Sequence, residues 1–238
     1  MKEKIYLDIL AQPDDITCGP TCLHAVYRYY EEDIPLNDVI EEVKSLEGGG
    51  TLAVFLGLSA LKHGYKARLY TYDLQVFDPS WFVDGHTDLS ERLQMRLEYM
   101  NQKKMKVVTS AYMDFLNKGG EIHYVDMTTT LLRKYLVRGI PILTGLSATH
   151  LYACPREIVR NGELVYDDIQ GDPTGHFVLL TGYTKENHAV WIADPLRPNP
   201  VSETAQYQID INHLICSIML GILTYDANLL VVLPKKRA

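Results

Sequence analysis

The stretch Gln12–Leu23 is QPDDITCGPTCL, and it places a cysteine, Cys18, where a helix is expected to begin. Thr17 can cap this helix, Pro20 suits its first turn, and apolar residues continue at helical spacing to Tyr30. A thiol at a helix N-terminus meets unpaired N–H groups and the positive end of the helix dipole, and both favour the thiolate. The position therefore favours a nucleophilic cysteine.

The neighbours of Cys18 fit the same chemistry. Gly19 would let a substrate approach the backbone closely, and backbone N–H groups at this turn can stabilise an oxyanion. Gln12, six residues upstream, is a side-chain donor within reach of that oxyanion. Two alternatives remain: Cys18 is a small buried apolar residue, or it binds zinc with Cys22 and His24. Cys22 lies one helical turn later, so we expect it in the core, and its spacing from Cys18 is not the usual one for zinc.

A cysteine nucleophile needs an imidazole as base, and the imidazole needs a group that orients it. His176 opens the apolar strand HFVLLTGY, and Asp194 ends the next strand, AVWIAD. A hairpin folded about residues 185–187 brings the two roughly level, and a small bulge or a choice of register sets them side by side. His150, in GLSATHLY, is the alternative base. The other interpretation of His176 is a histidine at a sheet edge with no catalytic role.

The rest of the chain predicts helices first and strands later, which is an α+β pattern. The expected helices cover residues 17–30, 36–46, 51–63, 89–100, 107–117 and 210–223, and the expected strands cover 4–10, 65–74, 140–146, 176–183, 189–193 and 228–233. We predict one domain over residues 1–238, with an insertion around 77–130 that covers the cleft.

Composition excludes several classes of protein. The 238 residues are 47% apolar and 22% charged, which is ordinary for a globular chain. The net charge is −7, and the longest basic cluster is Lys235–Arg237, so we expect no nucleic-acid partner. The longest apolar run, Leu214–Leu223, is about half of what a membrane span needs. Four cysteines and no signal peptide favour a cytoplasmic protein without a disulfide framework.

The combined motifs resemble the papain-like cysteine peptidases of the bacteriocin-processing, double-glycine type. They are Q-x5-CGPTCL, then GHFVLLTGY, then a turn and I-A-D-P. The resemblance implies Cys18 as nucleophile, His176 as base, Asp194 as the group that orients it, and Gln12 in the oxyanion hole. It also implies a papain-like fold, with N-terminal helices packed on a mostly antiparallel sheet, and neither a cofactor nor a metal.

The whole chain, including LEGGGTLAVFLG at residues 46–57, is more similar to stand-alone C39-like bacterial proteins. Such proteins are often encoded near ATP-grasp amino-acid ligases, which makes a functional link to one an expectation. We therefore expect a cysteine hydrolase that cleaves a peptide or amide bond in a peptide or protein substrate. Two alternatives stay open: an acyltransferase, deamidase or transglutaminase-like enzyme with the same triad, or a non-catalytic peptide-binding module.

Overall fold

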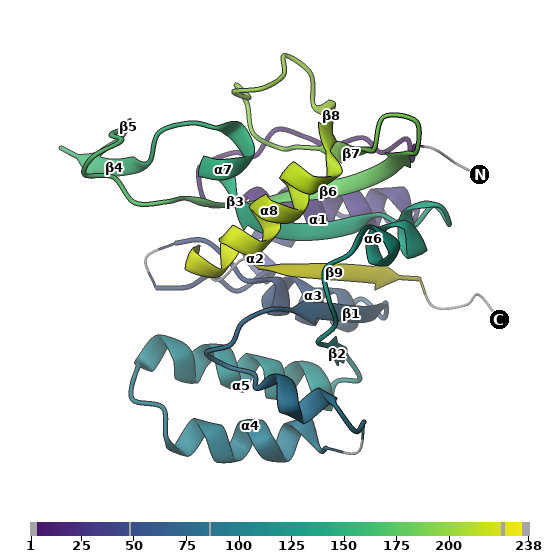
Figure 1. Ribbon diagram of the computed structural model, residues 1–238, viewed down its shortest axis with the longest axis vertical. Coiled ribbons are helices and arrows are strands. Elements are labelled where there is room, and N and C mark those ends of the chain that lie inside the picture. The colour runs from purple at the N-terminus through teal and green to yellow at the C-terminus, as the bar shows by residue number, and fades with distance from the viewer. Residues whose placement is uncertain (1–3, 48, 86, 225–226, 235–238) are drawn as a thin grey trace.

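A seven-stranded sheet runs through the computed structural model, which describes residues 4–47, 49–85, 87–224 and 227–234 (Figure 1). Its strands follow the order β2 (Glu121–His123), β1 (Lys66–Thr71), β9 (Asn228–Leu233), β3 (Ile142–Ser147), β6 (Gly175–Thr184), β7 (Ala189–Ala193) and β8 (Gln206–Asp210). Among the described residues, neighbouring strands of this sheet are antiparallel except for β1 and β2. The predicted α+β class with a mostly antiparallel sheet is confirmed.

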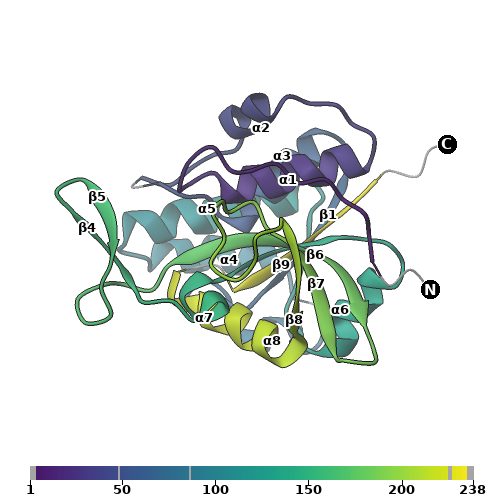
Figure 2. The ribbon, with the colours of Figure 1, turned by 90° about the horizontal axis from the view of Figure 1, so that it is seen from above.

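Helices cover both faces of this sheet (Figure 2). They are α1 (Cys18–Tyr29), α2 (Leu36–Glu42) and α3 (Ala53–Lys62) on one side, and α6 (Thr129–Leu136), α7 (Ala148–Tyr152) and α8 (Ile211–Leu220) on the other. Successive residues of β6 point to opposite faces. Phe177 and Leu179 belong to the apolar core that includes α1 and α3. Val178 and Leu180 belong to the core that includes α6, α7 and α8.

Most predicted elements are present with shifted ends. The helix that contains Cys18 begins at that residue, and β7 and β9 have the predicted bounds. The second helix is shorter than predicted and ends at Glu42. Gly64 follows α3 with a φ of +84°, a left-handed conformation that glycine adopts readily and that ends the helix. Within the described residues, no helix is long and apolar enough to cross a membrane.

The strand predicted for residues 4–10 is wrong. Lys4 makes a single bridge with Gly182, and the Ile5 N–H donates to the Thr181 carbonyl at 2.6 Å. The prediction also missed β2, α6, α7, β8 and a separate hairpin of β4 (Glu157–Arg160) and β5 (Glu163–Tyr166). These elements have three to eight residues, too few for a hydrophobic period to emerge.

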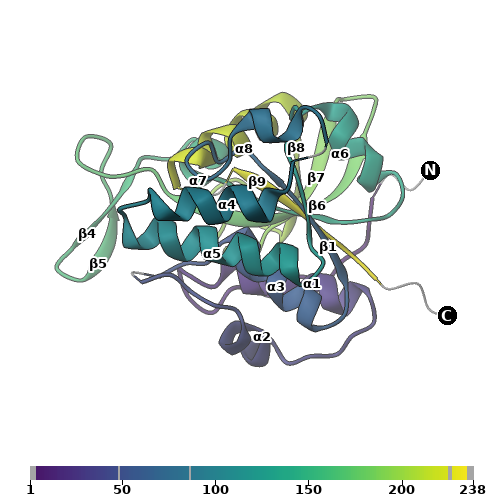
Figure 3. The ribbon, with the colours of Figure 1, turned by 90° about the horizontal axis from the view of Figure 1, so that it is seen from below.

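The insertion lies at the β2 edge of the sheet, at the opposite end from β7 and β8 (Figures 1 and 3). It contains η1 (Pro79–Phe82), α4 (Leu89–Glu98) and α5 (Lys103–Asn117). That the insertion covers the cleft stays a prediction. Phe115 of α5 is fully buried, and a Cβ added at Gly57 of α3 would lie 2.7 Å from its ring. This close packing holds the insertion against α3.

An extra residue in β6 decides which face Asp194 occupies. The β6–β7 register shifts between Leu180 and Gly182, so Thr181 is bulged. Continued past Leu179↔Ala193, the register sets Asp194 opposite Val178 and diagonal to His176 on the same face. Without the bulge, Asp194 would lie opposite Leu179 and on the other face of the sheet. Of the two options that the sequence left open, a bulge or a choice of register, the structure has the bulge.

Candidate active site

Cys18 is the first residue of α1, and its side chain is nearly buried, with 8% of the residue exposed. Thr17 occupies the N-cap position, but it makes no side-chain capping bond. A Cβ added at Gly19 would lie 2.6 Å from the Thr51 methyl and 3.3 Å from the Phe177 ring. Gly19 is therefore required for the close packing of α1 on its neighbours, and its role in the approach of a substrate stays a prediction.

His176 and Asp194 form a buried pair in which Nε2 lies 3.0 Å from Oδ1. Burial lowers the pKa of His176, but the charges of Asp194 and Cys18 and hydrogen bonds to both raise that pKa to about 10. Because Nε2 faces Asp194, Nδ1 is the ring nitrogen left for the thiol. The structure thus brings together three of the four predicted site residues.

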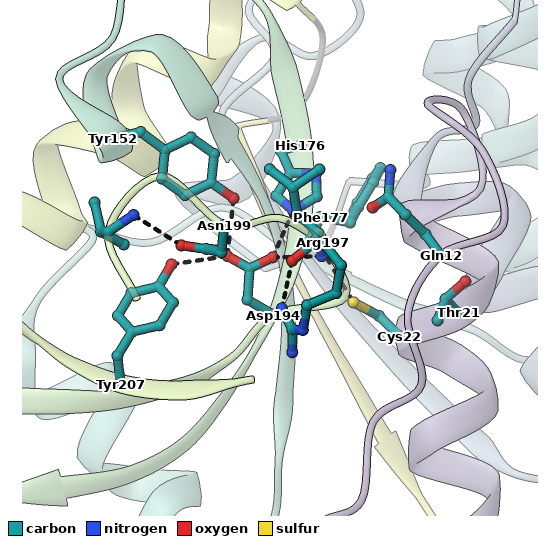
Figure 4. A network of polar contacts seen from close by, with 12 residues as sticks. Gln12, Thr21, Cys22, Tyr152, His176, Phe177, Asp194, Arg197, Asn199 and Tyr207 are labelled. Atoms are coloured by element: carbon teal, nitrogen blue, oxygen red, sulfur yellow. Dashed lines mark hydrogen bonds and ion pairs between the residues drawn. The ribbon is translucent and has the colours of Figure 1, made fainter. Parts of the chain in front are cut away.

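The Asp194 carboxylate is completely buried and accepts hydrogen bonds at both oxygens (Figure 4). The Tyr152 and Tyr207 hydroxyls each donate to Oδ2 at 2.8 Å, and the Leu196 N–H donates to Oδ1 at 3.0 Å. Burial raises the Asp194 pKa, but the His176 charge and these bonds outweigh it and lower the pKa to about 2. Asp194 is therefore held as a carboxylate.

Sequence reasoning missed the two tyrosines. They lie 42 and 13 residues from Asp194 in the chain, on α7 and β8, so no local spacing joins them to it. Burial and the charge of Asp194 raise the pKa of Tyr152 and Tyr207, which keeps both hydroxyls protonated as donors. The Leu196 bond did have a signal, because an aspartate commonly accepts from the N–H two residues on.

Gln12 lies beside this site, but its side chain already has a partner. Its backbone N–H donates to the Pro195 carbonyl at 2.9 Å, next to Asp194. Its Nε2 donates to the Asp14 carbonyl at 2.8 Å, and its Oε1 is buried without a partner among the described residues. An amide nitrogen carries two hydrogens, so one donor of Gln12 is left for another acceptor.

The competing candidates are placed elsewhere. Cys22 is fully buried and its thiol donates to the Phe177 carbonyl at 3.4 Å, so its predicted place in the core is confirmed. Burial and the Cys18 and Asp194 charges raise the pKa of Cys22 well above its usual value. The alternative base, His150, contacts the Ser217 hydroxyl through Nδ1 at 2.9 Å and stacks on the ring of His213.

The pKa shifts of His176 and Asp194 predict how stability depends on pH. Because the pKa of His176 is raised in the folded protein, its protonation stabilises the fold fully below about pH 6.5, and this contribution is lost as the pH rises towards 10. The lowered Asp194 pKa contributes above 3.8 and is lost as pH falls towards 2. We expect Asp194→Asn to lower the free energy of unfolding, measured in urea, by roughly 3 kcal/mol between about pH 4 and 6.5. The loss should be smaller at lower and at higher pH. The exposed Asp168→Asn should show no such profile.

Removing a tyrosine hydroxyl should weaken the hold on Asp194. Each of Tyr152→Phe and Tyr207→Phe leaves the carboxylate one donor short, so we expect a loss of roughly 1.5–3 kcal/mol in unfolding free energy. The His176 pKa, followed by NMR, should fall in both variants, because a less firmly held carboxylate supports the imidazolium less. Tyr183→Phe, a buried tyrosine away from Asp194, is the control. An unchanged His176 pKa would contradict this positioning role.

Several solved structures are similar to this chain. A putative C39-like peptidase from Bacillus anthracis superposes with a TM-score of 0.52 at 13% identity, covering 99% of this chain and 100% of that one. A double glycine motif protease from an AMS/PCAT transporter, in complex with the leader peptide, gives 0.48 at 14% identity, covering 99% and 96%. Xylellain, a cysteine protease from Xylella fastidiosa, gives 0.41 at 16%, covering 99% and 87%. At 13% identity, the likeness to the Bacillus anthracis structure concerns the fold alone.

No curated protein sequence matches the chain. The model of the Peptidase_C39 like family, however, matches residues 4–214. That range contains α1 with Cys18, the β6–β7 hairpin with His176 and Asp194, and both tyrosines that bind the carboxylate. The chain therefore belongs to the Peptidase_C39 like family, and it is a cysteine peptidase with an α+β, papain-like fold.

Proposed function

We propose that this peptidase hydrolyses peptide or amide bonds through Cys18, His176 and Asp194, with an acyl-enzyme intermediate. The observation that carries the proposal is the buried His176–Asp194 pair at 3.0 Å, with Cys18 among the groups that raise the pKa of its imidazole. A histidine held protonated between a carboxylate and a thiol stabilises the thiolate, which is the nucleophilic form of cysteine. No cofactor takes part in this chemistry.

Each group has one role in the proposed reaction. At rest, the Cys18 proton has moved to Nδ1 of His176, and Asp194 stabilises the imidazolium through Nε2. The thiolate attacks the carbonyl carbon of the substrate, and the resulting oxyanion accepts from the Cys18 N–H and the free Nε2 donor of Gln12. His176 then gives its proton to the leaving amine as the C–N bond breaks. Water, deprotonated by His176, attacks the thioester and releases the acid.

The tyrosines fix the geometry on which this proton transfer depends. Asp194 cannot rotate freely, because both of its oxygens are bonded. An orienting group that is held this tightly keeps the imidazole in one tautomer and one orientation. The His176 ring therefore stays aimed at the thiol through the catalytic cycle.

The thiolate can be detected without a substrate. We expect iodoacetamide at pH 6 to alkylate Cys18 at least about tenfold faster than Cys216, which is exposed and serves as the internal reference. An ordinary thiol is under roughly 1% ionised at that pH. His176→Ala should remove this advantage, and the matched variant His150→Ala should keep it. Equal rates at Cys18 and Cys216 in the wild type, measured by mass spectrometry, would contradict a thiolate–imidazolium pair.

Hydrolysis itself is tested with a tryptic peptide digest of a bacterial proteome. We expect the wild type to produce new peptide ends, which Cys18→Ala abolishes and Cys216→Ala leaves unchanged. Added hydroxylamine should divert part of the product to hydroxamates, because it competes with water for the thioester. Products that contain only amine adducts would instead identify an acyltransferase. Binding of peptides by Cys18→Ala, with no cleavage by the wild type, would identify a binding module.

A further inference from the structure

The β4–β5 hairpin projects from the body of the molecule just before β6 in the chain (Figures 1 and 2). Its strands pair with each other and not with the seven-stranded sheet. Asn161 and Gly162 join them, with φ values of +55° and +85°. Two such residues form the turn that favours a regular two-residue hairpin. The arm is therefore an ordered two-stranded ribbon.

The base of this arm is fixed to the strand that carries His176. Glu157 and Asp172 exchange two backbone hydrogen bonds, at 3.1 and 2.8 Å. The Glu157 carboxylate also accepts from the hydroxyl of Thr174, two residues before His176, at 3.0 Å. A Cβ added at Gly171 would lie 2.8 Å from the Glu157 nitrogen, so the two segments are in close contact. The arm is thus held at a set position relative to the triad.

The outer edge of β5 is open. The backbone N–H and C=O of Glu157 face the outer side of β4, where they bond Asp172. Glu157 is paired with Tyr166 across the ribbon, so the backbone N–H and C=O of Tyr166 face the outer side of β5. The backbone N–H and C=O of Leu164, two residues earlier, also face the outer side of β5. Among the residues that the structure describes, no strand pairs with this edge. The corresponding edge of β4 is occupied at its base by Asp172.

One face of the ribbon is apolar and exposed. Val159 pairs with Leu164, and Tyr166 lies on the same face. Their exposed fractions are 66%, 50% and 59%. A two-stranded sheet with an uncovered apolar face is marginal by itself, and a third strand would both pair its backbone and cover its side chains.

We propose that the outer edge of β5 binds the peptide substrate as an added antiparallel or parallel strand. This inference rests on the peptidase function proposed above and names its substrate class. The substrate is a peptide with an extended segment outside the scissile bond, in which apolar side chains occur at alternate positions. Backbone bonds to Leu164 and Tyr166 supply affinity, and the apolar face selects the alternate side chains.

Proline tests this edge directly, because it removes one N–H. Leu164→Pro deletes an outward donor of β5, and Val159→Pro deletes the equivalent outward donor of β4. Proline is tolerated where the lost N–H faces solvent, so both variants should fold. Both are compared with the wild type on the tryptic proteome digest, and iodoacetamide alkylation of Cys18 is measured in parallel. The same digest is also passed over each protein carrying Cys18→Ala, to measure retention of peptides without cleavage.

We expect the wild type to select peptides with apolar residues two positions apart. Leu164→Pro should reduce cleavage of those peptides, and their retention, at least about tenfold. Val159→Pro should resemble the wild type, and alkylation of Cys18 should be the same in all three proteins.

Unchanged peptide selection in Leu164→Pro, or an equal loss of cleavage in both proline variants, would overturn the inference. So would slowed alkylation of Cys18 in Leu164→Pro. A loss of peptide selection that accompanies a change from dimer to monomer in light scattering would also overturn it. If the wild type cleaves nothing, retention by the Cys18→Ala proteins decides. Selective retention that Leu164→Pro abolishes supports the edge although the proposed hydrolysis has failed, and absence of retention overturns it.

Discussion

The carboxylate of Asp194 is completely buried, and a buried charge is stable only where donors and a counter-charge surround it. Here two tyrosine hydroxyls, one backbone N–H and the His176 ring supply them. These donors come from α7, β8, the segment after β7, and β6, so one side of the molecule is organised around a single side chain. Removing any donor affects the packing of an element as well as the chemistry of the site.

The geometry of the site depends on the bulge in β6 and on the contact between the sheet and the layer of helices that contains α1. Thr181 shifts the register of β6 by one residue, which turns Asp194 to the face that His176 occupies. The Thr181 carbonyl accepts the Ile5 N–H, so the N-terminal segment is bonded to the bulge. Cys18 comes from the helix layer on the other face, and Gly19 allows that helix close contact with Phe177 of β6. The thiol and the imidazole therefore meet at the start of β6, where the two layers join.

Sequence patterns that span a few residues predicted those parts of the site that depend on a single helix or hairpin. The start of α1 at Cys18 was predicted from helix-start residues, although Thr17 makes no capping bond. The hairpin that joins His176 to Asp194 was predicted from two neighbouring apolar runs. Tyr152 and Tyr207 could not be predicted, because short elements far apart in the chain bring them to Asp194. The place of the insertion also depends on a distant contact, that of Phe115 with Gly57. The side-chain bond of Gln12 to Asp14 likewise follows from the conformation of a loop that has no period.

The central claim is that Asp194 and Cys18 hold His176 protonated. NMR of the histidine ring nitrogens, recorded against pH on the full chain with selectively labelled histidine, tests it most directly. We expect His176 to keep protons on both nitrogens at pH 8, above the ordinary histidine pKa of 6.5, and to titrate near pH 10. In Asp194→Asn the titration should move to lower pH. A wild-type His176 that is already neutral at pH 7 would contradict the account.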